Sequence, residues 1–310
     1  MDGDFTQLEW DALLAEDCRQ LIRLGIREDL EREHDWTTVS LVGPEAIGKA
    51  ALVARKPGVV AGLPTAELTL AEMDLRVEWQ TNAKDGETVA AGQTLAVIHG
   101  PARTLLTAER LLLNFVGHLS GVATLTRRYV DAIQGTNAKI YDTRKTTPGF
   151  RRLEKYAVCC GGGHNHRTGL YDAILIKDNH LALGAESLGL AHFSPADAVL
   201  AARRFVAETL PPERRQGFII EIEVDSLAQL EEVLPVRPDI VLLDNMPPAQ
   251  LRAAVARRDA VAADVQLEAS GGVNLDTVGA IARSGVDRIS VGALTHSAVW
   301  FDVGLDWMTA

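Results

Sequence analysis

The second half of the chain alternates short apolar segments with stretches of helical composition. The strand candidates are AKIYDT (138–143), DAILIK (172–177), GFIIEIEV (217–224), DIVLLD (239–244), VQLEAS (265–270) and RISVG (288–292). Near-continuous apolar strands are buried on both faces, as a parallel sheet covered by helices requires. This alternation predicts an α/β fold with a parallel sheet.

Most of these strand candidates end on a polar or glycine residue. The residues at or just after their ends are Arg144, Lys145, Lys177, Glu223, Asp244, Ser270 and Gly292. In a TIM-like barrel the carboxyl ends of the strands meet at one mouth, where catalytic residues gather. We therefore predict a TIM-like barrel with its active site at this mouth. The strand candidates are fewer than the eight strands of a complete barrel, so we expect an incomplete barrel or an unrecognised strand.

The first half of the chain has a different pattern. Residues 7–33 have the apolar spacing of a helix, and residues 50–101 form short alternating runs interrupted by glycine and proline. The second pattern indicates a small sheet with a helix across it. Residues 107–133 predict one long helix, or two abutting helices that break near Gly117 or Gly121.

Composition and charge limit the function classes. With 310 residues and 47% hydrophobic residues, the chain is long enough for one large α/β domain and a smaller one. A formal net charge of -11 argues against nonspecific nucleic-acid binding, which needs a basic surface. The chain has no run of about 18 uncharged apolar residues, and its start, MDGDFTQLEWD, is acidic where a signal peptide is basic. We therefore expect a soluble cytoplasmic protein that binds neither nucleic acid nor membranes.

A cluster of basic residues stands out on this acidic chain. Between Asp142 and His180 the basic residues outnumber the acidic ones. The basic residues are Arg144, Lys145, Arg151, Arg152, Lys155, Arg167 and Lys177, and the acidic ones are Asp142, Glu154, Asp172 and Asp178. For the RRLEK segment, a solvated helix face is an equally good interpretation. Several cations converging near a glycine-rich loop suit a small polyanion with planar carboxylates, which arginine binds in bidentate fashion.

The segment CCGGGHNHR (159–167) combines thiols, glycines, imidazoles and a guanidinium. Three glycines allow close approach of a ligand, and their amides suit an anion, although a plain turn is an alternative. His164 and His166 with Cys159 or Cys160 form a possible zinc set. The usual ligand spacings are absent, however, and nearby cations would repel a metal. The three cysteines of the chain cannot form a disulfide framework, so we expect reduced thiols.

Two acidic positions in GFIIEIEV lie on one face of the expected strand. Glu221 and Glu223 are two residues apart, so both side chains point to the same side, which we expect to be the barrel interior. Buried carboxylates need partners, and the candidates are Lys177 and a Mg²⁺ ion. A purely structural lysine–glutamate pair is the alternative. Asp244 ends an otherwise apolar strand, which favours a functional role.

Two successive strand-to-helix turns follow, at SGGVN (270–274) and ISVGAL (289–294). In TIM barrels the last turns of this kind frequently hold a phosphate through backbone amides and a helix N-terminus. Helix capping alone would also explain Ser270. The pattern therefore favours two anion subsites in one mouth, one for carboxylates and one for phosphate.

The segment DTRKTTPGFRRLEKYAVCCGGGHNHRTGLYDAILIKDNH (142–180) resembles the signature of the quinolinate phosphoribosyltransferase family, also called carboxylating nicotinate-nucleotide pyrophosphorylases. The resemblance extends through TAERLLLNFVGHLSGVAT, EIEVDSLAQLEEVL, VLLDN, EASGGVN and ISVGALTHS. It implies an N-terminal α/β sandwich (1–115, joined by 298–310) and an incomplete, seven-stranded TIM-like α/β barrel (116–297). It also implies at least a homodimer, in which the neighbour's N-terminal domain completes each active site.

The resemblance also implies roles for individual residues. Quinolinate would be held by Arg144, His166, Arg167 and Lys177, with Arg110 donated from the partner subunit. Phosphoribosyl pyrophosphate and Mg²⁺ would be surrounded by Lys145, Glu223, Asp244, Ser270, Gly271, Gly292 and His296, with Glu223 and Asp244 as metal ligands. Lys145, Lys177, Glu223 and Asp244 would be the catalytic residues. The implied reaction transfers the phosphoribosyl group to quinolinate with loss of CO₂, in NAD biosynthesis.

Three other functions stay open at this point. One is a phosphoribosyltransferase for another ring carboxylate, such as nicotinate, without decarboxylation. Another is a lyase that uses Lys177 as a Schiff-base nucleophile. The third is a noncatalytic carboxylate sensor, which would bind quinolinate and release no pyrophosphate.

Overall fold

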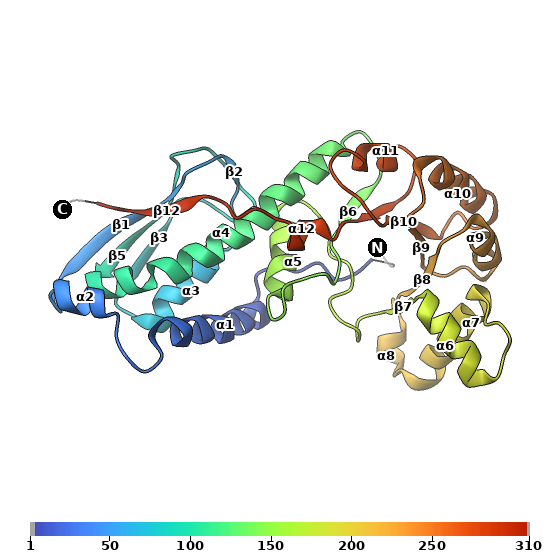
Figure 1. The fold of residues 1–310 in the computed structure, drawn as a ribbon, viewed down its shortest axis with the longest axis horizontal. Coiled ribbons are helices and arrows are strands. Elements are labelled where there is room, and N and C mark those ends of the chain that lie inside the picture. Colours follow the sequence, from blue (N-terminus) through green and yellow to red (C-terminus); the bar gives the residue numbers. More distant parts are fainter. Residues whose placement is uncertain (1–3, 309–310) are drawn as a thin grey trace. The chain divides into compact units, whose positions relative to one another are not determined.

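The computed structural model describes residues 4–308, and the chain divides into two compact units (Figure 1). The barrel unit consists of the described residues of Met1–Thr6 together with Arg128–Lys145 and His164–Ala293. The sandwich unit consists of Gln7–Arg127, Thr146–Gly163 and the described residues of Leu294–Ala310. These bounds differ from the predicted ones, which place residues 116–127, 146–163 and 294–297 in the barrel and residues 4–6 in the sandwich.

The barrel unit contains a parallel sheet of six strands in the order β6-β11-β10-β9-β8-β7 (Figure 1). The strands are β6 (Lys139–Tyr141), β7 (Ile174–Ile176), β8 (Ile220–Val224), β9 (Ile240–Asp244), β10 (Gln266–Ser270) and β11 (Arg288–Ser290). Each falls within one of the six predicted segments. Among residues 4–308 the parallel sheet has six strands, so the seven-stranded barrel stays a prediction. Beside β6 there is an isolated parallel bridge between Tyr141 and His164.

The helices of the barrel unit follow the strands along the chain, as a parallel sheet requires. They are α6 (Asp178–Leu188), α7 (Pro195–Thr209), α8 (Pro212–Arg215), α9 (Leu227–Val233), the 3₁₀ turn η1 (Leu234–Val236), α10 (Pro248–Val261) and α11 (Val278–Ala282). The short helix α12 (Ala293–His296) begins where the barrel unit ends. Serine side chains cap two of these helices, with Ser194 at α7 and Ser226 at α9.

The two faces of the parallel sheet differ in chemistry. Residues paired across parallel strands point to the same side, so the register assigns each side chain to a face. One face is apolar and buried: Ile220, Ile222, Val241, Leu243, Leu267, Ala269 and Ile289. The other face carries Glu221, Glu223, Asp244, Glu268, Ser270, Arg288 and Tyr141. Side chains of β8 and β10 come together on this second face although β9 lies between them, so this face is concave.

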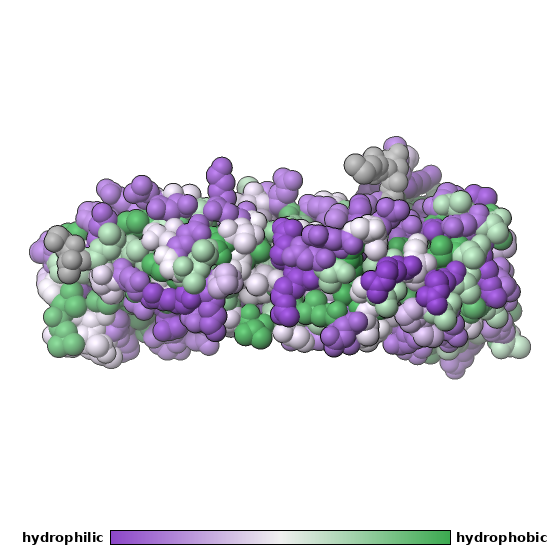
Figure 2. Space-filling view, turned by 90° about the horizontal axis from the view of Figure 1, so that it is seen from above, coloured by the Kyte–Doolittle hydropathy of each residue, from purple (hydrophilic) through white to green (hydrophobic). Residues whose placement is uncertain are grey.

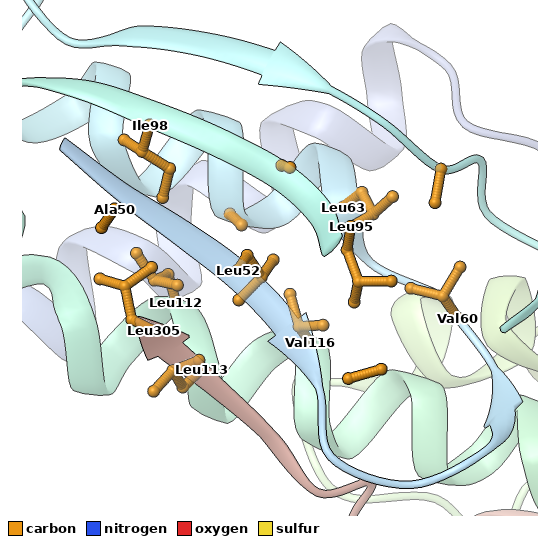
Figure 3. Packing of buried hydrophobic residues seen from close by; sticks show 14 of the residues in the cluster. Ala50, Leu52, Val60, Leu63, Leu95, Ile98, Leu112, Leu113, Val116 and Leu305 are labelled. Atoms are coloured by element: carbon orange, nitrogen blue, oxygen red, sulfur yellow. The ribbon is translucent and has the colours of Figure 1, made fainter. Parts of the chain in front are cut away.

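The sandwich unit has an antiparallel sheet in the order β12-β1-β5-β3. The strands are β1 (Ile47–Ala54), β3 (Glu78–Thr81), β5 (Thr94–Pro101) and β12 (Val303–Trp307), and β2 (Gly58–Val59) pairs with β4 (Thr88–Val89). The helices are α1 (Ala12–Leu30), α2 (Trp36–Leu41), α3 (Leu63–Met73), α4 (Ala102–Ala132) and α5 (Arg151–Cys160). Residues of the sheet pack with α3 and α4 in one apolar core that includes Leu52, Leu95 and Leu112 (Figure 3).

Helix α4 runs unbroken through the two glycines at which a break was predicted. A Cβ atom at Gly117 would lie 3.1 Å from the carbonyl oxygen of Phe301, and one at Gly121 would collide with the carbonyl of Val299. The amide of Phe301 also donates a hydrogen bond to the carbonyl of Gly117, at 2.7 Å. The glycines therefore allow the C-terminal segment to lie against the helix, and their cost in helix propensity is offset by the long packed helix around them.

The surface of the described residues is mostly hydrophilic in the view of Figure 2, with smaller hydrophobic patches between. Within residues 4–308 no helix combines the length and the apolar character needed to cross a bilayer. The three cysteines, Cys18, Cys159 and Cys160, form no disulfide. Burial raises the pKa of the Cys160 thiol to about 12, which fits the packing role expected from the sequence.

Candidate active site

Lys177 and Glu223 lie at the carboxyl ends of neighbouring strands and contact each other through Nζ and a carboxylate oxygen. The register of β7 against β8 places them on the same face, because Leu175 pairs with Glu221. The Glu223 side chain is 17% exposed and the Lys177 side chain 41% exposed, so the pair lies at an open edge of the concave face. The expectation that Glu223 points inward toward Lys177 is confirmed.

Asp244 and Ser270 are directly paired at the ends of β9 and β10. The Asn245 side chain donates to Asp244 at 2.7 Å, and the Asn245 backbone amide donates to the Ser270 carbonyl at 2.9 Å. Gly271 follows at a φ of 94°, which L side chains rarely adopt, and a Cβ atom there would collide with the Asn245 side chain. The glycine is therefore required for the chain to turn beside Asp244.

Asp142, at the end of β6, fixes the next part of the site. Its carboxylate is buried and accepts a hydrogen bond from the His166 amide at 2.8 Å and one from the Asn165 side chain at 2.8 Å. The Asp142 amide donates to the His164 carbonyl at 3.0 Å. These contacts hold residues 164–167 along the edge strand of the sheet.

Arg144 and Arg167 bring two positive charges together beside this segment. Burial lowers the pKa of the Arg167 guanidinium, and repulsion from Arg144 lowers it further. The Arg167 side chain is 7% exposed and donates to the Ala173 carbonyl at 3.3 Å. Two neighbouring guanidinium groups in a partly desolvated site favour a ligand that carries several negative charges.

His166 joins the Arg167 segment to two buried carboxylates. Its Nε2 atom is 3.0 Å from Glu221 and 3.5 Å from Glu268, and its Nδ1 atom accepts a hydrogen bond from the Arg167 amide at 2.7 Å. Burial alone would lower the pKa of His166, but the carboxylates of Glu221 and Glu268 outweigh burial and raise it. The predicted contact of His166 with a substrate carboxylate stays a prediction.

Arg288 neutralises the second buried carboxylate. Its Nε atom donates to Glu268 at 2.9 Å, and one terminal nitrogen donates to Asp4 at 2.9 Å. Burial raises the pKa of Glu268, and the nearby Glu221 raises it further against the opposing effect of His166 and Arg288. The interior of the concave face thus carries His166, Glu221, Glu268 and Arg288 as mutually compensating charges.

Among residues 4–308, His166, Glu221 and Glu268 are the group whose donor atoms lie close enough to hold a metal, within 4.8 Å of one another. Because Nδ1 accepts the Arg167 amide, the ring proton lies on Nε2, which faces the carboxylates and is the atom that would have to bind the metal. Arg288 also donates a hydrogen bond to Glu268, so this carboxylate already has a cationic partner. The group therefore fits an ion-pair network better than a metal centre. The zinc set considered from the sequence differs from this group, because it would combine histidines of the barrel unit with cysteines of the sandwich unit.

The three glycines 161–163 do not offer their amides to a ligand. Their amides donate to carbonyls at the end of α5, namely those of Ala157, Cys159 and Val158, at 2.9–3.0 Å. Cβ atoms at Gly161 and Gly163 would collide with α4 at Thr126. The expectation of an anion-binding loop is wrong here, because these amides terminate a helix and the missing side chains allow close packing.

The remaining predicted residues are divided between the two units. The basic cluster is divided between the units, because Arg151, Arg152 and Lys155 belong to α5 of the sandwich unit. Lys155 is fully buried, so a solvated helix face does not describe it. Arg110 is exposed on α4, and exposed His296 contacts Ser297 in the sandwich unit. Lys145 is exposed, and half-buried Gly292 follows β11.

Sequence reasoning missed Asp4, Phe5, Glu268 and Arg288. Glu268 and Arg288 had a usable signal, because each lies two residues before a serine of the same strand, Ser270 or Ser290, and therefore on the same face as that polar residue. Asp4 and Phe5 had none, because their partners lie more than a hundred residues away along the chain.

Comparison with known proteins gives one consistent result. The chain matches the family models described as "Quinolinate phosphoribosyl transferase, N-terminal domain" over residues 35–120 and "C-terminal domain" over residues 122–306. It is 46% identical over 293 residues to a carboxylating nicotinate-nucleotide pyrophosphorylase of Mycobacterium leprae, covering 93% of this chain and 96% of that protein. A probable enzyme of the same name from Bacillus subtilis is 38% identical over 272 residues, with 88% and 87% covered. The structure of the nicotinate-nucleotide pyrophosphorylase from Francisella tularensis superposes with a TM-score of 0.87 at 32% identity, covering 98% of this chain and 100% of that one.

Proposed function

The chain belongs to the quinolinate phosphoribosyltransferase family, and from this premise we infer that it is the decarboxylating pentosyltransferase of NAD biosynthesis. It transfers the phosphoribosyl group of phosphoribosyl pyrophosphate to quinolinate and yields nicotinate mononucleotide, pyrophosphate and CO₂. The observation that carries this inference is the pair of neighbouring guanidinium groups of Arg144 and Arg167 on the barrel unit that also carries the Lys177–Glu223 contact.

We propose that quinolinate binds with its two carboxylates toward Arg144, Arg167 and Lys177. The mutual repulsion that lowers the pKa of Arg167 would be relieved by a dianion between the guanidinium groups. His166, which accepts the Arg167 amide through Nδ1, would be a further contact of quinolinate. Each charge-assisted contact is worth about 1.5–3 kcal/mol, so this site distinguishes quinolinate from a ring with one carboxylate.

The phosphoribosyl side of the proposed site is acidic. As the pyridine nitrogen attacks C1 of the ribose and pyrophosphate leaves, positive charge develops on the sugar. Glu223 and Asp244, on neighbouring strands of the concave face, are suited to stabilise that charge. Ser270, Gly271 and Gly292 would bind phosphate at the following turns, with Lys145 and His296 as further contacts. After alkylation, the cationic ring nitrogen stabilises the carbanion that remains when the adjacent carboxylate leaves as CO₂.

Glu223 and Asp244 also suit Mg²⁺ by donor type. Both are carboxylates at the open ends of strands, and Mg²⁺ in phosphoryl-ligand sites is held by one or two carboxylates together with substrate oxygens. A Mg²⁺ ion held there would neutralise charge on the departing pyrophosphate.

We further propose that the molecule acts as a cytoplasmic homodimer. Arg110 is an exposed arginine on α4, and in this proposal it reaches the quinolinate site of the partner subunit. The bridge between Tyr141 and His164 is the proposed remnant of a seventh barrel strand. Domain boundaries near residue 115 are supported by the family models, which meet between residues 120 and 122.

One assay tests the function directly. The protein is mixed with quinolinate, phosphoribosyl pyrophosphate and Mg²⁺, and release of CO₂ and formation of nicotinate mononucleotide are followed against a nicotinate control. We expect turnover with quinolinate. Turnover with nicotinate alone would replace the proposal by a non-decarboxylating transferase. Binding of quinolinate without pyrophosphate release would indicate a sensor, and borohydride trapping of Lys177 would indicate a Schiff-base lyase.

A further inference from the structure

The N-terminal residues Asp4 and Phe5 belong to the barrel unit, whereas the chain from Gln7 onward belongs to the sandwich unit. Asp4 accepts hydrogen bonds from the Tyr141 hydroxyl at 2.8 Å and from Arg288 at 2.9 Å. Burial alone would raise the pKa of the Asp4 carboxyl, but Arg288 and these hydrogen bonds hold it below its ordinary value. The arm, defined here as Asp4 and Phe5, is therefore anchored by charge.

Phe5 is the apolar part of the arm. Its side chain is 5% exposed and packs in one cluster with Ala173, Ile219 and Ile240. These three residues lie at or just before the amino ends of β7, β8 and β9. Lys177 and Glu223 lie at the opposite, carboxyl ends of β7 and β8. The arm thus closes the floor of the barrel unit, away from the proposed mouth.

A short chain of contacts joins this floor to the proposed quinolinate site. The Phe5 ring stacks on the His166 ring with centroids 4.4 Å apart and an interplanar angle of 28°. The Nε2 edge of the same imidazole faces Glu221 and Glu268, and its Nδ1 atom receives the Arg167 amide. Phe5 therefore fixes the plane of the one ring that connects the buried carboxylates to the backbone of Arg167.

We propose that the arm is a positioning element for the carboxylate site, in which Phe5 orients His166 and His166 orients Arg167. This inference rests on the proposed function, because quinolinate is taken as the ligand of Arg167. Neither family model reaches the arm, since the N-terminal one begins at residue 35. Phe5 touches no reacting atom in this scheme and acts only through His166.

The test measures quinolinate binding by calorimetry without phosphoribosyl pyrophosphate, together with KM for each substrate. Phe5→Ala removes the stacked ring, and Phe5→Tyr retains it. Phe115→Ala is the matched control, because Phe115 is 3% exposed and stacks on Phe150 in the sandwich unit, centroids 5.6 Å apart. We expect Phe5→Ala to weaken quinolinate binding and raise its KM about tenfold or more while the KM for phosphoribosyl pyrophosphate is unchanged. Phe5→Tyr should restore both quinolinate values.

The outcomes separate this inference from the proposed function. If the wild-type protein binds no quinolinate, the proposed function fails. If the wild type binds it and Phe5→Ala binds equally well, or if Phe115→Ala with the same loss of thermal stability raises the quinolinate KM as much, the arm has no positioning role. A rise of both KM values together in Phe5→Ala would also contradict it, because it would show general loosening of the fold.

Discussion

Replacing Arg288 by Met would remove a cation that is 1% exposed and touches two acids. The methionine side chain occupies much of the space of the arginine stem, so the change acts mainly through charge. Glu268 would then stay buried beside Glu221 with His166 as the remaining partner. Breaking a buried ion pair from one side typically costs about 3–5 kcal/mol. The Arg288 guanidinium also lies 3.6 Å over the Tyr141 ring, and losing that contact adds about 1–2 kcal/mol.

We therefore expect Arg288→Met to lower the free energy of unfolding by about 4–7 kcal/mol in urea titrations at neutral pH. The loss should be smaller in acid. The pKa of Glu268 is already raised by burial, and a carboxyl with a raised folded pKa loses stability as pH rises from its ordinary value through the folded one. Removing Arg288 raises the folded pKa of Glu268 further, so the pH range over which stability is lost becomes wider. Protonating Glu268 removes the uncompensated charge.

The double variant Arg288→Met with Glu268→Met is the matched control. It removes one positive and one negative charge together and leaves His166 facing Glu221, so the balance of charge is kept. Replacing a whole buried pair by apolar side chains is often nearly neutral. We expect the double variant to be more stable than the single one. A single variant within about 1 kcal/mol of the wild type, or a double variant no better than the single, would refute the interpretation as a compensated network.

Three further predictions concern the site. Arg144→Leu and Arg167→Leu should each lower kcat/KM for quinolinate at least about tenfold in steady-state kinetics. The KM for phosphoribosyl pyrophosphate should change little. Equal losses for both substrates would count against the assignment of these arginines to the carboxylates. Gly271→Ala should raise the KM for phosphoribosyl pyrophosphate and destabilise the protein by about 1–3 kcal/mol. Gly272→Ala should affect packing less, because no atom lies near the Cβ position of residue 272. Similar melting temperatures for the two variants would contradict the collision with Asn245. Because the pKa of His166 is raised in the folded state, its contribution to stability is complete below about pH 6.5 and is lost as pH rises through the folded value, so urea titrations across this range should show a decline that His166→Gln abolishes.

The parallel sheet was predictable because its apolar residues are continuous in sequence. All six strands fall within predicted segments, and the strand-end positions of Lys177, Glu223 and Asp244 followed from where the apolar runs end. The proximity of Lys177 to Glu223 was predictable for the same reason, since parallel strands align their carboxyl ends.

What sequence could not give depends on contacts distant along the chain. The resemblance implies a substrate role for His166, but nothing local in the sequence shows that Glu221 and Glu268, on other strands, lie beside its ring. The glycines 161–163 have the composition of an anion-binding loop, but their amides donate to carbonyls at the end of α5. The glycines of α4 were interpreted as breaks because the C-terminal segment that packs on them lies more than a hundred residues later. Local propensity carries no information about partners that are distant along the chain.

The pairing of β12 with β1 constrains how the chain is made. Strand β1 precedes the barrel segments 128–145 and 164–293 in the sequence, and its edge partner β12 follows them. Neither unit is a continuous stretch of the chain. A nascent chain arrested before residue 303 would expose the free edge of β1 and would be a target for chaperones, so the native sheet can close only after both barrel segments have been synthesised.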